Sequence, residues 1–315
     1  MDYGIFSHIE RLDDLERDLR AADADGIASY WLTQGFGHDA LTVIGAYGRQ
    51  LTRLRIGTAV VPVYPRHPMA LAQQALTTNM LLGGRLVLGV GPSHPQVVEP
   101  CWGMSYERPA RYMREYLTAL NGALTQRVRY TGEVITARGD LTISGDPPAP
   151  AVMVSALGPK MLELTGALAA GTITWMVGPR TLTELTVPTI TAAAQAAGRP
   201  APEIVVTAAV CVTDDPARAR AAIDPVLGWY DDKPSYRAML DREGMQRANQ
   251  MAIVGDADEV RAEIDRYARA GATTFAAQFY GTPEERAATR ALIGELAGTG
   301  APAGGIPRSP GDGRQ

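Results

Sequence analysis

One short segment combines a buried strand with side chains that can do chemistry. Residues 84–95, GRLVLGVGPSHP, run from an apolar strand into a loop that carries Ser93 and His94. Uninterrupted apolar strands are typical of buried parallel sheets, and the carboxyl ends of such strands are where α/β folds place their active sites. Imidazole titrates near neutral pH, so His94 is a candidate proton donor that Ser93 can orient. The alternative is an ordinary solvent-exposed loop histidine.

The composition is that of an ordinary globular protein, with 315 residues, 46% hydrophobic and 20% charged. A formal net charge of -4 argues against a nucleic-acid partner, because phosphate binding needs a basic surface. The two cysteines, Cys101 and Cys211, fit neither a disulfide framework nor a metal site. No apolar run reaches membrane-spanning length, and the first expected strand leaves no room for a signal peptide. We therefore expect a cytoplasmic protein without a membrane partner.

Short apolar runs alternate with helical patterns along the chain, which predicts a parallel sheet with crossover helices. Eight strands are expected: Tyr3 to Phe6, Ser29 to Leu32, Arg55 to Val61, Arg85 to Val90, Val152 to Ala156, Thr172 to Met176, Ile204 to Val212 and Thr274 to Ala277. Eight such units indicate an α/β fold of the (β/α)8 TIM-barrel type, and the alternative is a doubly wound open sheet.

Two stretches interrupt this alternation and are expected to be insertion segments of one barrel domain over residues 1–297. Residues 127–150 are predicted to form a hairpin, and residues 225–250 are rich in Tyr, Met and Arg. Such segments usually shape the mouth of a substrate site. The residues from 298 to 315 have few large apolar side chains and are expected to be a disordered tail.

Four segments together resemble the bacterial luciferase-like superfamily, and within it the oxidoreductases that use the deazaflavin coenzyme F420. They are GTAVVPVYPRHPMALAQQAL at 57–76, GGRLVLGVGPSHPQVVE at 83–99, YERPARYMREYL at 106–117 and AIVGDADEVRAEIDRYARAGATTF at 252–275. The resemblance implies an enzyme whose barrel holds F420, or alternatively FMN, at the carboxyl ends of its strands. It also implies a small-molecule substrate and a homodimer.

The resemblance further implies which residues hold the cofactor. In the family, strand three ends in a bulge with a non-prolyl cis peptide behind the ring, and the matching position here is Ala59–Val60. Small residues at a helix amino terminus let backbone N–H groups approach an anion, and in the family the loop after strand five takes the cofactor's phosphate. The expected cofactor contacts are Gln34, Thr58, Ala59, Val60, Ser93, Ser155, Ala156, Leu157, Gly158, Thr174 and Trp175.

This chain departs from the family at one point. Many relatives carry Asp-His after strand two, whereas Gln34 and Gly35 stand here and a histidine follows only at His38. A catalytic role of that missing histidine would pass to His38, His94 or His8, or the reaction would need no such group. We take His94 and His38 as the catalytic candidates, and Gln34 as a ring contact through its amide.

Three further side chains are candidates for substrate binding. They are His8, Tyr64 and Trp102. The function we expect is hydride transfer between F420 and a small organic substrate, in particular reduction of an activated C=C or C=N bond. Two alternatives remain at this stage, an FMN-dependent luciferase-like monooxygenase and a barrel that binds a flavin without turnover.

Overall fold

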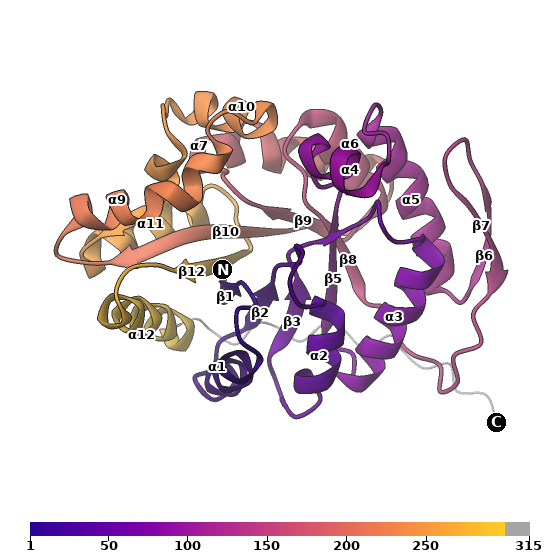
Figure 1. The fold of residues 1–315 in the computed structure, drawn as a ribbon, viewed down its shortest axis with the longest axis horizontal. Helices are drawn as coiled ribbons and strands as arrows, with labels where there is room; N and C mark the ends of the chain where they lie inside the picture. Colours follow the sequence, from indigo (N-terminus) through magenta and orange to yellow (C-terminus); the bar gives the residue numbers. More distant parts are fainter. Residues whose placement is uncertain (300–315) are drawn as a thin grey trace.

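Strand β1 (Asp2–Ser7) is paired in parallel with a neighbour on each side, and this double pairing closes the sheet into a barrel. Its neighbours are β2 (Ser29–Leu32) and β12 (Thr274–Phe279). The computed structural model describes residues 1–299 (Figure 1). The remaining barrel strands are β3 (Arg55–Thr58), β5 (Leu86–Gly91), β8 (Ala151–Val154), β9 (Gly171–Thr174) and β10 (Glu203–Val212). Because β10 pairs with both β9 and β12, the ring is complete and the predicted (β/α)8 barrel is confirmed.

The eight predicted strands all form, with differences at their ends. The third strand stops at Thr58 and resumes as β4 (Val61–Pro62), which pairs with β5. The interruption is a cis peptide bond between Ala59 and Val60, at the predicted position. A short strand that the sequence did not indicate, β11 (Ile253–Gly255), pairs with the part of β10 that extends beyond the barrel.

Helices surround the barrel and follow its strands in turn (Figure 1). The longer ones are α1 (Leu12–Ala24), α2 (Ala40–Gly48), α3 (Pro68–Leu81), α5 (Pro109–Leu124), α6 (Pro159–Leu168), α8 (Val187–Ala196), α11 (Ala257–Arg269) and α12 (Pro283–Thr299). Shorter ones are α4 (Pro95–Trp102), α7 (Pro179–Thr181) and the π-helix η1 (Leu182–Thr186). Helix α12 includes Gly298 and Thr299, the first two residues of the expected tail, and the rest of that tail lies outside the described residues.

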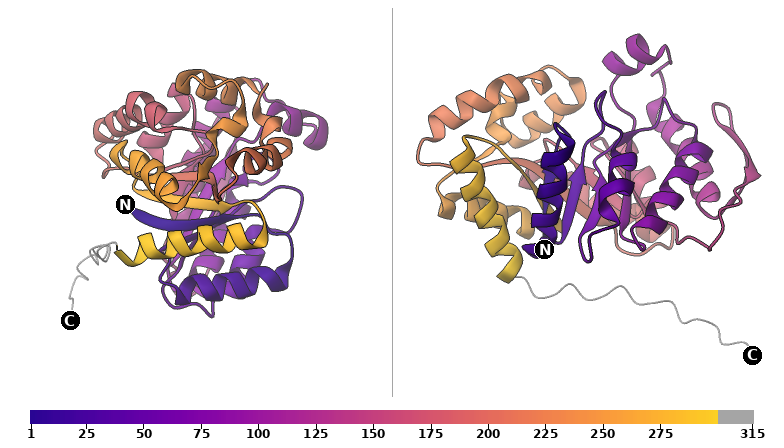
Figure 2. Two further views of the ribbon diagram at one scale, coloured as in Figure 1. Left: turned by 90° about the vertical axis from the view of Figure 1, so that its left-hand side faces the viewer. Right: turned by 60° about the horizontal axis from the view of Figure 1, so that its bottom comes forward.

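Two insertions leave the barrel as expected. The first is the antiparallel hairpin of β6 (Arg127–Thr131) and β7 (Thr136–Asp140). The second comprises α9 (Pro216–Leu227), the 3-10 turn η2 (Gly228–Tyr230), α10 (Pro234–Glu243) and the 3-10 turn η3 (Ala248–Met251). It packs an apolar cluster of its own against Ala209 and Cys211 near the end of β10. Figure 2 shows this insertion and α12 from two further sides.

An ion pair closes the amino end of the barrel. The Arg55 guanidinium donates to both carboxylate oxygens of Glu203, at 3.2 and 3.1 Å, and Thr274 donates to the same carboxylate. These are the first residues of β3, β10 and β12. Next along the barrel lies an apolar layer that includes Trp31, whose indole fits because Gly57 has no side chain: a Cβ there would lie 2.4 Å from the ring. The amino end is therefore packed, and only the carboxyl end is left for a site.

Helix α11 supplies the first prediction. Asp256 caps it by accepting hydrogen bonds from the backbone N–H groups of Asp258 and Glu259, and Glu259 bonds back to the N–H of Asp256. We expect Asp256→Ala to lower the free energy of unfolding by about 1 kcal/mol, the usual cost of losing an N-cap. Urea denaturation measures the change. Asp256→Asn keeps a capping oxygen and should cost much less; equal losses in the two variants would contradict the capping explanation.

Candidate active site at the carboxyl end of the barrel

The carboxyl end of the barrel is lined by aromatic and small side chains. Phe6 of β1 belongs to the interior layer, and Ala59, Val60 and Trp175 pack against that layer while remaining partly exposed. The rings of Phe6 and Trp175 lie 5.4 Å apart between centroids. This is the expected place for a flat ligand, because (β/α)8 barrels bind ligands at the carboxyl ends of their strands and apolar walls accept a ring.

His94 lies in the loop after β5, and aromatic rings of the second insertion pack against it. Its imidazole centroid is 5.3 Å from that of Trp229 and 5.5 Å from that of Tyr236. Burial lowers the pKa of His94 below its ordinary value of 6.5, and the nearby charge of Lys233 lowers it further. A lowered pKa leaves the imidazole mostly neutral at pH 7, so in the free protein it is a proton acceptor before it is a donor.

Ser93 does not orient His94 as the sequence suggested. The interaction that holds Ser93 is through its backbone carbonyl, which accepts a hydrogen bond from the Tyr106 hydroxyl at 2.9 Å. Ser93 has a φ of 58°, a left-handed conformation that is uncommon outside glycine. Burial raises the pKa of Tyr106 to about 12, so its hydroxyl stays protonated and remains a donor. Tyr106 therefore fixes the loop that carries His94.

The two other candidate histidines lie elsewhere on the rim. The Nδ1 atom of His8 is 2.8 Å from the hydroxyl of Thr33, and its ring lies 6.0 Å from that of Phe6. Burial lowers the pKa of His8, although Glu10 partly opposes this. His38 is exposed in the loop before α2. The structure thus places His94 and His8 beside rim aromatics and leaves His38 at the surface.

Gln34 is already engaged by its own loop. Its Nε2 donates to the Asp39 carboxylate at 3.3 Å, and its Oε1 accepts from the N–H of Ala40 at 3.2 Å. Asp39 also caps α2 and pairs with Arg66. Although burial works in the other direction, hydrogen bonds from Arg66 and Thr42 lower the pKa of Asp39 to about 2. Both ends of the Gln34 amide therefore serve the start of α2.

The loop from Ser155 to Gly158 leads from β8 into the start of α6. Gly158 is the N-cap residue, no side chain caps this helix end, and a Cβ added at Gly158 would meet no atom within 4 Å. Ser155 and Val60 converge over Gly91, because a Cβ there would lie 2.3 Å from the Ser155 hydroxyl and 2.7 Å from Val60. This side of the rim combines an open helix amino terminus with close-packed small residues.

Several other candidate residues are already hydrogen-bonded or packed within the protein. The Thr58 hydroxyl donates to the carbonyl of Gly89, and the Thr174 hydroxyl lies 3.4 Å from the carbonyl of Val205. Both side chains are fully buried. Tyr64 is 4% exposed and stacks on Tyr112 at 4.2 Å, which leaves little surface for a substrate.

Two further candidates, Leu157 and Trp102, keep part of their side chains exposed. Ala156 is buried while Leu157 is partly exposed, so only the second offers side-chain surface there. Trp102 ends α4 and faces the highly exposed Phe36, at 6.1 Å between ring centroids. The exposed Phe36 and the partly exposed Trp102 thus form an aromatic pair.

The second insertion brings to the rim aromatic residues that were not predicted. Tyr230 forms edge contacts with Trp229, Tyr236 and Trp175. The Nζ atom of Lys233 lies 4.6 Å from the centroid of Trp229. Burial raises the pKa of Tyr230 above its ordinary value. The one available signal was the unusual aromatic content of residues 225–250.

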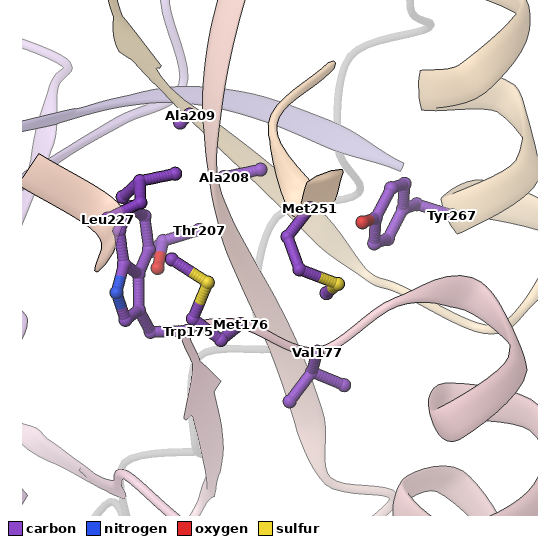
Figure 3. Close-up of a pocket in the computed structure, with 9 residues that line it drawn as sticks. All are labelled: Trp175, Met176, Val177, Thr207, Ala208, Ala209, Leu227, Met251 and Tyr267. Atoms are coloured by element: carbon purple, nitrogen blue, oxygen red, sulfur yellow. The ribbon is translucent and has the colours of Figure 1, made fainter. Parts of the chain in front are cut away.

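A small cavity separates the barrel from this insertion (Figure 3). Its volume is about 10 Å³, which is close to the least that a water molecule needs, so a ring cannot occupy it. Its lining residues are Trp175, Met176, Val177, Thr207, Ala208, Ala209, Leu227, Met251 and Tyr267. The cavity therefore marks the packing of insertion on barrel beside Trp175 and is not itself the ligand site.

Comparison with known proteins identifies the family. The model of the family described as luciferase-like monooxygenase matches residues 1–274. The chain belongs to this family. A Mycobacterium tuberculosis protein, provisionally named a coenzyme F420-dependent oxidoreductase, is 31% identical over 229 residues, which are 67% of this chain and 66% of the relative. The resemblance found in the sequence, to enzymes of the luciferase-like family with F420-dependent members, is confirmed.

Solved structures of luciferase-like proteins share the fold. The coenzyme F420-dependent tetrahydromethanopterin reductase of Methanopyrus kandleri has a TM-score of 0.79 at 20% identity, covering 93% of this chain and 97% of its own. A type II Baeyer–Villiger monooxygenase of Pseudomonas putida, solved with FMN, has a TM-score of 0.74 at 17% identity, covering 98% and 99%. At these identities the likeness shows the fold alone.

Two structural observations bear on other classes of site and location. In residues 1–299, no three His, Cys, Asp or Glu side chains gather as a metal ion would require. Within the same residues, every helix is too short or too polar to cross a bilayer.

Proposed function

We propose that this luciferase-like chain is an F420-dependent oxidoreductase that transfers hydride between the coenzyme and a small organic substrate. The observation that carries the proposal is the start of α6, which no side chain caps, beside the point where Ser155 and Val60 converge over Gly91. A coenzyme with a flat ring and a phosphate needs both an apolar wall and free backbone N–H groups. The residues at this rim fit both requirements, and the F420-dependent relatives support the choice of coenzyme.

The positions of the residues around the rim suggest a role for each of them. The deazaflavin supplies the hydride chemistry when it is bound. Ala59, Val60 and Trp175 would support and desolvate the ring, and the loop from Ser155 to Gly158 would hold the phosphate. His94 would deliver the proton that accompanies reduction of an activated C=C or C=N bond, or accept one in the reverse direction. Trp229 and Tyr236 would exclude water from that step.

A second candidate function is an FMN-dependent monooxygenase. It is favoured by the family model, which is described as luciferase-like monooxygenase and matches residues 1–274. Such an enzyme would need dioxygen and a reductase partner, and its ring would use the same rim. A barrel that binds a flavin without turnover would share the rim as well.

Titration of the purified chain with F420 and with FMN, followed by ligand fluorescence, tests the proposal. We expect the chain to bind F420 at least ten times more tightly than FMN. Single-turnover hydride transfer from reduced F420 to an enone such as 2-cyclohexen-1-one, under anaerobic conditions, then tests catalysis. Tight binding of FMN without affinity for F420 would overturn the proposal, and F420 binding without transfer to any enone or imine would favour the binding barrel.

We further propose that the chain forms a homodimer through α2 and α3. These helices enclose an open groove of about 570 Å³ that is lined by Leu41, Thr42, Gly45, Ala46, Ala70, Gln73, Gln74, Thr77, Thr78 and Leu81. Half of the lining residues are Leu, Ala or Gly and the other half are Thr or Gln. Leu81, which lines the groove, and Met80, its neighbour in the chain, are large apolar side chains that are more than 40% exposed. A second copy of the chain would cover both side chains and presents the same surface in return.

The dimer gives a direct prediction. Leu81→Glu is expected to raise the dimer dissociation constant about ten-fold or more, because it places a charge in an apolar contact. Analytical ultracentrifugation measures the change. Val226→Glu is the matched control, since Val226 is 50% exposed on α9, away from the groove. A wild-type chain that sediments as a monomer at micromolar concentration would contradict the proposal.

We also propose that the protein is cytoplasmic. The exposed free thiol of Cys101 is compatible with the reducing conditions of that compartment.

A further inference from the structure

One buried acceptor faces the mouth of the barrel without a partner. Gln278 is 8% exposed, and its Oε1 accepts no hydrogen bond from any atom of residues 1–299. Gln278 lies near the end of β12, where alternate side chains share a face. Ala276, two residues earlier, packs with Phe6 and Trp31 in the barrel interior. Gln278 therefore lies on the inner face, one layer nearer the carboxyl end.

The neighbours of Gln278 explain why it has no donor. Ala209 is its partner in the register with β10, and it carries no polar side-chain atom. On the other side, Ile5 pairs with Ala277, which places the ring of Phe6 beside Gln278. The hydroxyl on the inner face of β10, that of Thr207, is already donated to the carbonyl of Thr174 at 2.6 Å. The buried indole N–H of Trp175, at the same mouth, also has no partner among the described residues and does not donate to Gln278. The surroundings thus leave this acceptor to a group that comes from outside the chain.

Unpartnered buried acceptors are rare in native proteins and destabilise them, so one that is retained in a site needs an explanation. Gln34 differs, because the structure uses both ends of its amide internally. We propose that Gln278 is a specificity residue of the site. It accepts a hydrogen bond from an O–H or N–H group of a ligand whose remaining surface contacts the apolar and aromatic rim. This proposal rests on the proposed function only in assuming that a ligand binds at this mouth of the barrel.

Two sources can supply that donor: an N–H of the coenzyme ring, or a hydroxyl or N–H of the substrate. In either case the ligand class is the same, a largely apolar planar molecule with one hydrogen-bond donor directed at β12. A site with a buried hydrogen-bonding group rejects an analogue that lacks the matching group, because the protein atom is then left unpaired. Recognition at Gln278 therefore discriminates by the presence of the donor and not by size.

Gln278→Met tests the proposal, since methionine has a similar length and no acceptor of comparable strength. We expect its melting temperature to equal or exceed that of the wild type, because the unpaired acceptor is gone. Loss of the ligand's hydrogen bond should weaken binding about five-fold or more. Asn79→Leu is the matched control: Asn79 is also buried, but it bonds the carbonyl of Pro148 and the N–H of Leu86. That variant should melt lower and leave ligand affinity unchanged.

Two binding arms separate the sources. Fluorescence titration with F420 reports the coenzyme arm, and calorimetric titration with indole and 1-methylindole, which differ by one donor, reports the substrate arm. Weaker F420 binding by Gln278→Met assigns the donor to the coenzyme. Unchanged F420 binding with a lost preference for indole assigns it to the substrate. A lower melting temperature with both affinities unchanged would overturn the proposal. If the wild type binds no F420, the proposed function fails while the indole arm still decides the role of Gln278.

Discussion

Replacement of His94 with Gln is expected to slow reduction of an enone by reduced F420 about 10²- to 10⁴-fold, the usual contribution of a general acid. The expectation depends on the position of His94 after β5 and on its enclosure by Trp229 and Tyr236. Gln keeps a hydrogen-bonding side chain of similar size, so coenzyme affinity should be unchanged. Stopped-flow measurement of hydride transfer separates these two quantities. A loss smaller than five-fold would remove His94 from the proton-transfer step.

The pH dependence of kcat/KM gives a second test of the role of His94. Burial and Lys233 lower the pKa of His94 below 6.5, so the protonated form that reduction requires is lost as pH rises through that lowered value. For reduction, kcat/KM should therefore fall with rising pH, with its midpoint below 6.5. Lys233→Met removes the repelling charge and should move this midpoint upward, toward 6.5. A kcat/KM for reduction that rises over the same pH range would show that protonated His94 is not the acid of this step.

The barrel was predictable because its signals are local. Runs such as Val87 to Val90 are buried on both faces and read as continuous apolar segments, and the number of such runs then selects the closed barrel. The third strand was predicted to run unbroken to Val61, whereas β3 ends at Thr58. The residue types after Thr58 give no sign of the bulge that interrupts it. Its position came from the family resemblance and not from apolar periodicity.

The neighbours of each site residue were much less predictable. His94 meets Trp229 and Tyr236, which lie more than 130 residues further along the chain, and nothing local to either segment specifies that contact. Gln34 was expected at the ring, but Asp39 lies five residues away and engages its amide first. Gln278 could have been found in part, because it is a long polar side chain that directly follows the apolar run of residues 275–277 in a predicted strand. Its lack of a donor depends on Ala209 and Phe6, which only the closed barrel brings beside it.

Gly158→Asp is expected to weaken F420 binding about 100-fold while leaving the stability of the fold unchanged to within about 1 kcal/mol. Gly158 has an ordinary extended backbone, with φ -86° and ψ 158°, and an added Cβ meets no atom. Aspartate is a preferred N-cap residue, so its carboxylate would accept the N–H group of Lys160 and place a negative charge where the phosphate is proposed to bind. Gly158→Asn makes the same cap without the charge and should cost about ten-fold, so the difference between the variants isolates the electrostatic part. Equal F420 affinity in all three proteins, measured by fluorescence titration, would mean that the anion binds elsewhere on the rim.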